Sequence, residues 1–120
     1  MVKKNSNVES VSYPGLEDDK NYTKATKYLK NGAGAVLSFN LKGTKEDTVK
    51  VLESLKLVSH LANVGDAKTL IIQPSATTHQ QLSEQEQLNA GITPTMLRVS
   101  VGIEHIDDII EDFNQAINSL

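Results

Sequence analysis

Cysteine is absent from this chain of 120 residues, which excludes a disulfide framework, thiol catalysis and a cysteine zinc site. Basic residues are not in excess either, because 12 Lys and Arg are set against 15 Asp and Glu, for a net charge of -3. Such a balance lacks the basic stripe with which nucleic-acid-binding proteins contact phosphates. No apolar run is as long as a membrane span, and residues 1–5 lack the apolar core of a signal peptide. We therefore expect a cytoplasmic protein with no nucleic-acid or membrane partner.

Complete catalytic motifs are missing as well. The histidines His60, His79 and His105 are far apart and share no metal-ligand spacing. There is no Gly-x-Ser-x-Gly elbow, and the glycine pair in residues 32–34 precedes an expected strand, whereas a dinucleotide-binding motif follows a strand and opens a helix. The residues of this chain predict neither a metal site nor a catalytic residue.

Short apolar strands alternate with amphipathic helices along the chain, which is typical of a single α/β or α+β domain. Strands are expected over residues 8–13, 35–42, 69–73 and 97–103. Helices are expected over residues 18–30, from the cap Thr44 to near His60, behind a Ser83/Glu86 capping box to Ala90, and from Ile106 to Ile117. We expect one domain over residues 1–120.

The last expected helix begins among carboxylates: Glu104, Asp107, Asp108, Glu111 and Asp112. Acidic side chains suit the positive N-terminal end of a helix dipole. We interpret all five as a solvated face and not as a metal cluster.

The most informative pattern lies in residues 97–103, where an arginine occupies the polar side of an otherwise apolar strand. Alternation puts four apolar residues on one face and Arg98, Ser100 and Gly102 on the other. A guanidinium held on a strand and aimed into a cleft can bind a carboxylate or phosphate through two parallel hydrogen bonds. The alternative is a surface salt bridge of little energetic value, which the alternation alone favours.

Three motifs occur in order in the second half of the chain: residues 63–70 (NVGDAKTL), 74–82 (PSATTHQQL) and 98–104 (RVSVGIE). They resemble the C-terminal domain of the cysteine/methionine-metabolism family of pyridoxal-phosphate enzymes. Within that family, similarity to O-acetylhomoserine sulfhydrylases continues through residues 13–16, 32–39 and 54–62. The resemblance therefore covers the chain from about residue 8 to its end.

The resemblance implies the small C-terminal domain of a fold-type I pyridoxal-phosphate enzyme, with a mostly antiparallel sheet of about four strands and helices packed on one face. In the parent enzyme, pyridoxal phosphate would be held by a lysine of a large cofactor-binding domain that is absent from residues 1–120. The implied reaction transfers sulfide or a thiol to O-acetylhomoserine, in a parent that is commonly a homotetramer. The isolated domain is expected to be inactive.

Three substrate-binding residues are implied by the same resemblance. Arg98 matches the family arginine that holds the substrate α-carboxylate, and this agreement with the strand pattern now outweighs the salt-bridge interpretation. Thr78 occupies the position whose hydroxyl lies near that carboxylate, and Asn63 the position beside the cofactor and substrate. The alternatives are a turn role for Asn63 and a loop-capping role for Thr78.

The chain also departs from the family pattern. Gln73 occurs where relatives usually have histidine, and His105 where they have an acidic residue, so we expect no acid–base role for either. Residues 25–29 resemble the family's cofactor-lysine segment, but the residues that follow do not fit, and Lys27 lies in a lysine-rich helix that is expected to be exposed. Lys27 is therefore not expected to bind pyridoxal phosphate.

A second class of function stays open from the sequence. A stand-alone α/β module could use Arg98 to bind a carboxylated metabolite or a partner without any catalysis, and the fold alone would not distinguish the two.

Overall fold

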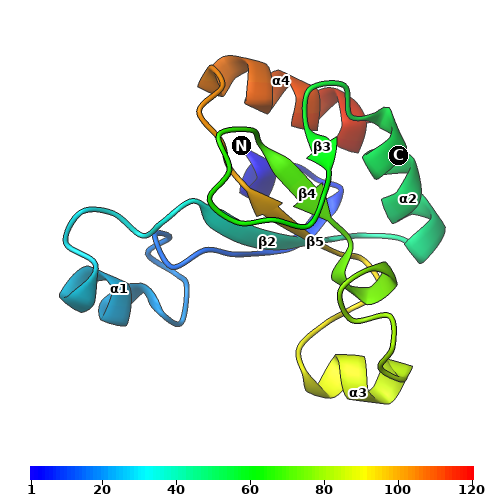
Figure 1. The fold of residues 1–120 in the computed structure, drawn as a ribbon, viewed down its shortest axis with the longest axis horizontal. Coiled ribbons are helices and arrows are strands. Elements are labelled where there is room, and N and C mark those ends of the chain that lie inside the picture. Colours follow the sequence, from blue (N-terminus) through cyan, green and yellow to red (C-terminus); the bar gives the residue numbers. More distant parts are fainter.

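The computed structural model describes residues 1–120 as one five-stranded sheet with helices around it (Figure 1). The strands are β1 (Val8–Ser12), β2 (Val36–Leu41), β3 (Ser59–His60), β4 (Leu70–Ile72) and β5 (Met96–Ser100). The helices are α1 (Tyr22–Tyr28), α2 (Lys45–Ser54), α3 (Glu84–Asn89) and α4 (Ile106–Ile117), with short 3-10 turns at Val2–Lys4 and Pro74–Ala76. The expected α/β class is confirmed.

The strands lie in the order β1-β2-β5-β4-β3, so β5 is the central strand. Every neighbouring pair is antiparallel except β3 and β4, which are parallel. The sheet is therefore mixed and has one more strand than expected. The extra strand is β3, which has two residues and is too short for an alternating pattern to reveal.

The second helix ends earlier than we expected. Thr44 caps α2 through the backbone N–H of Asp47, and the Asp47 side chain accepts a hydrogen bond from the N-cap backbone. The helix stops at Ser54, and His60 lies in β3. The reason is a distant carboxylate: Asp112 accepts hydrogen bonds from the backbone N–H groups of residues 56–58 at 2.8–2.9 Å, which removes those donors from a helix.

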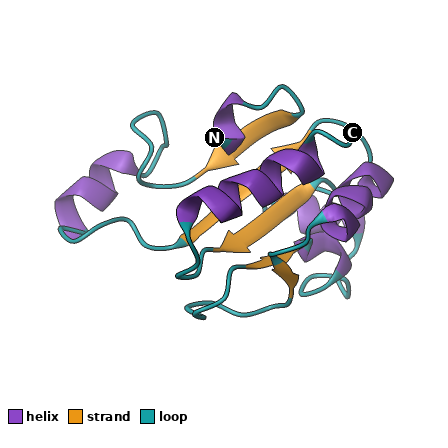
Figure 2. Ribbon diagram, turned by 90° about the horizontal axis from the view of Figure 1, so that it is seen from above, coloured by secondary structure: helices purple, strands orange, loops and turns teal.

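The core fills the space between one face of the sheet and the helices α2 and α4. Phe39 and Leu97 on the central strands are almost fully buried, as are Val51 of α2 and Phe113 of α4. The rings of Phe39 and Phe113 meet edge to face, with centroids 6.2 Å apart. Figure 2 shows α4 lying across the sheet. Side chains from the sheet and from both helices therefore pack in one common core.

Two of the four helices, α2 and α4, cover one face of the sheet as expected, whereas α1 and α3 do not pack on it. α1 projects past the ends of β1 and β2 in both views (Figures 1 and 2) and buries only Ala25. α3 likewise buries only Gln87. Neither short helix presents an apolar stripe wide enough to cover a sheet.

The strand expected over residues 97–103 ends at Ser100. Leu97 and Val99 are buried as the alternation requires, but Ile103 is 86% exposed. The chain bends at residues 103–104, just after Gly102, where an added Cβ would lie 2.3 Å from the carbonyl oxygen of Ala67. This close approach ends the strand pattern before Ile103.

Two of the five carboxylates near α4 are not on a solvated face, so that part of the interpretation was wrong. Asp112 is 5% exposed and accepts the three backbone hydrogen bonds described above. Glu104 accepts from both the backbone N–H and the hydroxyl of Thr69.

Nowhere does the structure place three or more His, Cys, Asp or Glu side chains where they could hold a metal ion. No helix has the length and apolar character needed to cross a membrane.

Candidate functional site

Arg98 lies in the middle of β5, paired with Ser38 of β2 on one side and Ile72 of β4 on the other. Its neighbours Leu97 and Val99 fill the core face, so the Arg98 side chain projects from the opposite face of the sheet. Because β5 is hydrogen-bonded to a strand on each side, the backbone position of Arg98 is fixed. The expected orientation of Arg98 is confirmed.

The half-buried Arg98 side chain lines an open hollow of about 300 Å³. Its lining comes from the end of β1, from β2 and β5, and from the segment after β4: Ser12, Pro14, Val36, Leu37, Ser38, Pro74, His79, Ile92, Met96 and Arg98. No lining residue is acidic, and none is a lysine. The guanidinium is therefore the only permanent charge in the hollow.

Arg98 forms no salt bridge and no side-chain hydrogen bond within the chain; the ion pairs are Lys3–Asp18 and Lys50–Asp47, and Nδ1 of His105 lies 3.7 Å from the Asp107 carboxylate. The surface salt bridge that the strand pattern left open is thus not formed. A guanidinium has five N–H donors, and a planar two-oxygen anion can accept two of them side by side. The hollow is suited to bind a carboxylate.

Thr78 lies near this hollow but does not line it. Its hydroxyl is 2.9 Å from Nδ1 of His79, and His79 is the residue of this pair that reaches the hollow. The backbone N–H of His79 donates to the carbonyl of Pro74, which fixes the turn that places the imidazole. Sequence reasoning considered His79 only as a metal ligand and missed this position. Its place beside Thr78 in the second motif was the available signal.

Asn63 lies in the exposed loop between β3 and β4 and does not line the hollow. Its Oδ1 accepts from the backbone N–H of Val64 at 2.8 Å, and its Nδ2 donates to Asp66 at 3.3 Å. These bonds are the ones expected of a turn residue. The loop nevertheless reaches the Arg98 face of the sheet, because the N–H of Gly65 donates to Oγ of Ser100 at 3.3 Å.

The two positions that depart from the family pattern have structural partners. Gln73 is 2% exposed and donates from Nε2 to the carbonyl oxygen of Pro94 at 2.6 Å. His105 is the N-cap of α4, where its Nδ1 accepts from the N–H of Asp107 at 3.3 Å. Both side chains are used to hold backbone in place.

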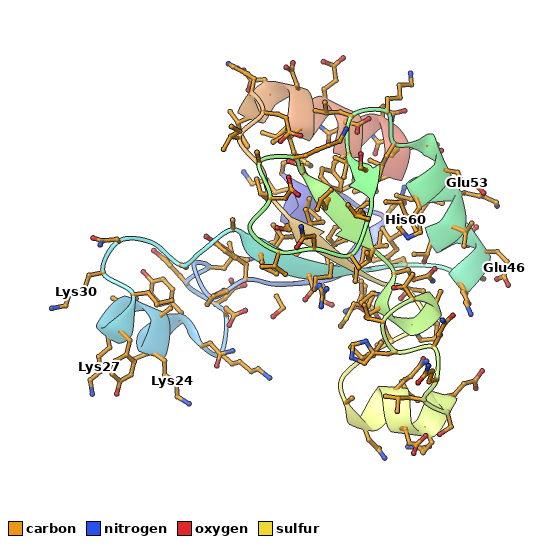
Figure 3. All side chains as sticks on the ribbon, viewed as in Figure 1. Lys24, Lys27, Lys30, Glu46, Glu53 and His60 are labelled. Atoms are coloured by element: carbon orange, nitrogen blue, oxygen red, sulfur yellow. The ribbon has the colours of Figure 1, made fainter.

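The lysines of α1 lie away from the hollow. Figure 3 shows Lys24 and Lys27 of α1, and Lys30 just after it, pointing outward from a part of the chain that is remote from the sheet. The ammonium group of Lys27 lies 5.3 Å from the ring centroid of the exposed Tyr28. Since the hollow has no lysine that could form an imine, the residues of this chain do not by themselves fit pyridoxal phosphate, and they fit a carboxylate.

Residues 1–118 match the family of Cys/Met metabolism PLP-dependent enzymes. A small α/β domain with an unpaired arginine in a hollow on its sheet agrees with that match, and the chain belongs to this family. The expected resemblance is confirmed, and with it the dependence of the family on pyridoxal phosphate.

Named relatives agree closely in sequence and in structure. The chain is 59% identical to homocysteine synthase of Schizosaccharomyces pombe over 97% of its own length, and 48% identical to O-acetyl-L-homoserine sulfhydrylase of Leptospira meyeri over 100%. A crystal structure named as an O-acetylhomoserine (thiol)-lyase of Campylobacter jejuni, containing N'-pyridoxyl-lysine-5'-monophosphate, superimposes with a TM-score of 0.92 at 40% identity over 98% of this chain. The chain spans 27% of each of the two curated relatives and 28% of the crystallised chain.

Proposed function

We propose that this chain is the substrate-clamping domain of an O-acetylhomoserine sulfhydrylase, in which Arg98 holds the α-carboxylate of O-acetylhomoserine. The observation that carries the proposal is the unpaired guanidinium in a hollow without any acidic residue. The names of the close relatives supply the substrate class. In this proposal residues 1–120 are the small domain, and a large cofactor-binding domain lies outside them.

The role of the domain is orientation of the substrate. Two parallel hydrogen bonds from one guanidinium fix the position and the rotation of a carboxylate at once. The strand that carries Arg98 is paired on both sides, which fixes the backbone from which the guanidinium extends. Holding a substrate in one geometry contributes to rate because the entropy of alignment has already been lost on binding.

The cofactor contributes chemistry that this chain lacks. When bound, pyridoxal phosphate withdraws electrons from the substrate, which eases removal of the α-proton and departure of the acetate group. In our proposal the residues of this chain bind and orient the substrate. The lysine that binds pyridoxal phosphate covalently lies outside residues 1–120.

Kinetics of a chimaera test this role. The chain replaces the matching quarter of the fission-yeast homocysteine synthase, which is 59% identical to it. Arg98→Ala is expected to raise KM strongly, to lower kcat, and to lower kcat/KM for O-acetylhomoserine by about a hundredfold, in line with the loss of a paired charge. Arg98→Lys keeps the charge but not the planar guanidinium. Its kcat/KM is expected to lie between those of the unchanged chimaera and Arg98→Ala.

Lys27→Ala is the matched control, because it also removes one cation from the same domain but from an exposed helix remote from the hollow. Its kcat/KM is expected to equal that of the unchanged chimaera. An unchanged kcat/KM in Arg98→Ala would overturn the proposal, and loss of activity in Lys27→Ala would show that Lys27 was wrongly dismissed.

A further inference from the structure

The loop between β3 and β4 carries Asn63 and approaches the same face of the sheet as Arg98. Arg98 and Ser100 are two residues apart on β5 and therefore project from the same face. Ser100 is 4% exposed, and its hydroxyl accepts from the N–H of Gly65 at 3.3 Å. A buried hydroxyl thus joins the strand that carries Arg98 to the loop that carries Asn63.

Apart from a local bond from the backbone N–H of Lys68 to Asp66, this is the one hydrogen bond that joins residues 62–66 to the rest of the chain. Within the loop, Asn63 and Asp66 bond to each other and to neighbouring backbone groups, which shapes the turn without attaching it. Gly65 has φ 77°, a conformation that side-chain-bearing residues rarely adopt, and this conformation presents its N–H to Ser100. The middle of the loop therefore depends on one hydroxyl for its place over the sheet.

The base of the loop is fastened separately. Glu104 accepts from the N–H and the hydroxyl of Thr69, whose Oγ1 in turn accepts from the N–H of Gly102. The carbonyl of Ala67 accepts from the N–H of Ile103. These bonds fix where the loop rejoins the sheet, while residues 62–66 stay free to move if the Ser100 bond is lost.

We infer that Ser100 is a positioning residue, which sets the place of the 62–66 loop beside the carboxylate site and so presents Asn63 to a bound substrate. Ser100 acts through Gly65 and need not touch the ligand. The inference rests on the proposed function, because it supposes that a substrate held by Arg98 lies under this loop.

Amide exchange on the chain itself tests the attachment. Ser100→Ala is expected to speed exchange of the Gly65 amide about tenfold, since one hydrogen bond contributes about that factor to an equilibrium, and to leave the Val99 amide protected. Ser100→Thr keeps the hydroxyl and is expected to restore slow exchange. Ser59→Ala is the control, because Ser59 lies on β3 and its side chain makes no hydrogen bond. Unchanged Gly65 exchange in Ser100→Ala overturns the inference.

Kinetics of the chimaera then test the consequence for the substrate. Ser100→Ala is expected to lower kcat/KM for O-acetylhomoserine about tenfold, with Ser100→Thr close to the unchanged protein. If Arg98→Ala lowers kcat/KM but Ser100→Ala does not, the positioning role fails and the proposed function stands. If Arg98→Ala has no effect, the proposed function fails, whatever Ser100→Ala does to the exchange of Gly65.

Discussion

Asp112 joins two parts of the chain that are more than 50 residues apart. Its carboxylate accepts hydrogen bonds from the N–H groups of Lys56, Leu57 and Val58, and Gln115 donates to it from the same helix. Burial raises the pKa of Asp112, but these donors outweigh burial and the pKa is lowered from its ordinary value. The charged carboxylate thereby locks α4 onto the segment after α2.

Replacing Asp112 by Ala is expected to lower the free energy of unfolding by about 3 kcal/mol, because three backbone donors lose their acceptor. Urea denaturation near pH 7 measures the change. Asp108→Ala is the control, since Asp108 is exposed on the same helix, and a change of about 0.5 kcal/mol or less is expected. An equal loss of unfolding free energy in the two variants would show that the hydrogen bonds of Asp112 do not stabilise the fold.

The same contribution depends on pH with a defined sign. Because the pKa of Asp112 is lower in the folded protein than its ordinary value of 3.8, its stabilisation is complete above pH 3.8 and disappears as the pH falls through the folded value. The stability difference between the parent chain and Asp112→Ala should therefore shrink below pH 3.8. A difference that is constant with pH would contradict this assignment.

Local patterns explain which single residues could be predicted. The side on which Arg98 projects follows from alternation within one strand, and the sequence contains all of that information. The roles of Asp112 and Ser100 could not be predicted in the same way, because their partners are distant in sequence and meet them only after folding.

α1 is the element least supported by the rest of the molecule. It has seven residues, buries only Ala25, and projects away from the sheet (Figure 1). Isolated helices shorter than about 12 residues are marginal in water, and the N-cap Asn21 makes no side-chain hydrogen bond to stabilise this one. Residues 20–30 also carry four lysines and no acidic residue.

Amide exchange is therefore expected to be fastest in α1 among the helices longer than six residues, and at least a hundredfold slower in β2 and β5. Hydrogen–deuterium exchange followed by NMR or mass spectrometry measures both. Protection in α1 equal to that in the central strands would mean that the helix is packed in solution, in contrast to the arrangement described here.

The elements also show where prediction from sequence stops. The Thr44 cap and the Ser83/Glu86 capping box were predicted correctly, since each is complete within four residues. The end of α2 was predicted too late because it is set by Asp112, and β3 was missed because it has only two residues and depends on pairing with β4. Of the three predicted site residues, Arg98 lines the hollow, Thr78 adjoins the lining residue His79, and Asn63 lies in a loop that does not line it.

For the molecule as a whole, the proposed function requires more protein than these 120 residues. The hollow is open, and the chain spans about a quarter of its curated relatives. A clamping domain with only one wall of a site should bind its substrate very weakly. A stand-alone binding module should instead bind a carboxylated amino acid without pyridoxal phosphate.

Calorimetric titration of the isolated chain with O-acetylhomoserine distinguishes the two. We expect no measurable heat of binding with up to millimolar ligand, and the same for Arg98→Ala. Binding that is tight in the parent chain and lost in Arg98→Ala would support the stand-alone module, and the clamping role within a larger enzyme would have to be abandoned.

The sharpest test removes each side of the proposed contact in turn. In the chimaera, kcat/KM is measured for O-acetylhomoserine and for its α-carboxamide analogue, with Arg98 and with Arg98→Ala. If Arg98 holds the carboxylate, the analogue should be about a hundredfold poorer with Arg98 present and no poorer with alanine there, because the two changes remove the same interaction. An equal loss in both proteins would show that the carboxylate is held elsewhere.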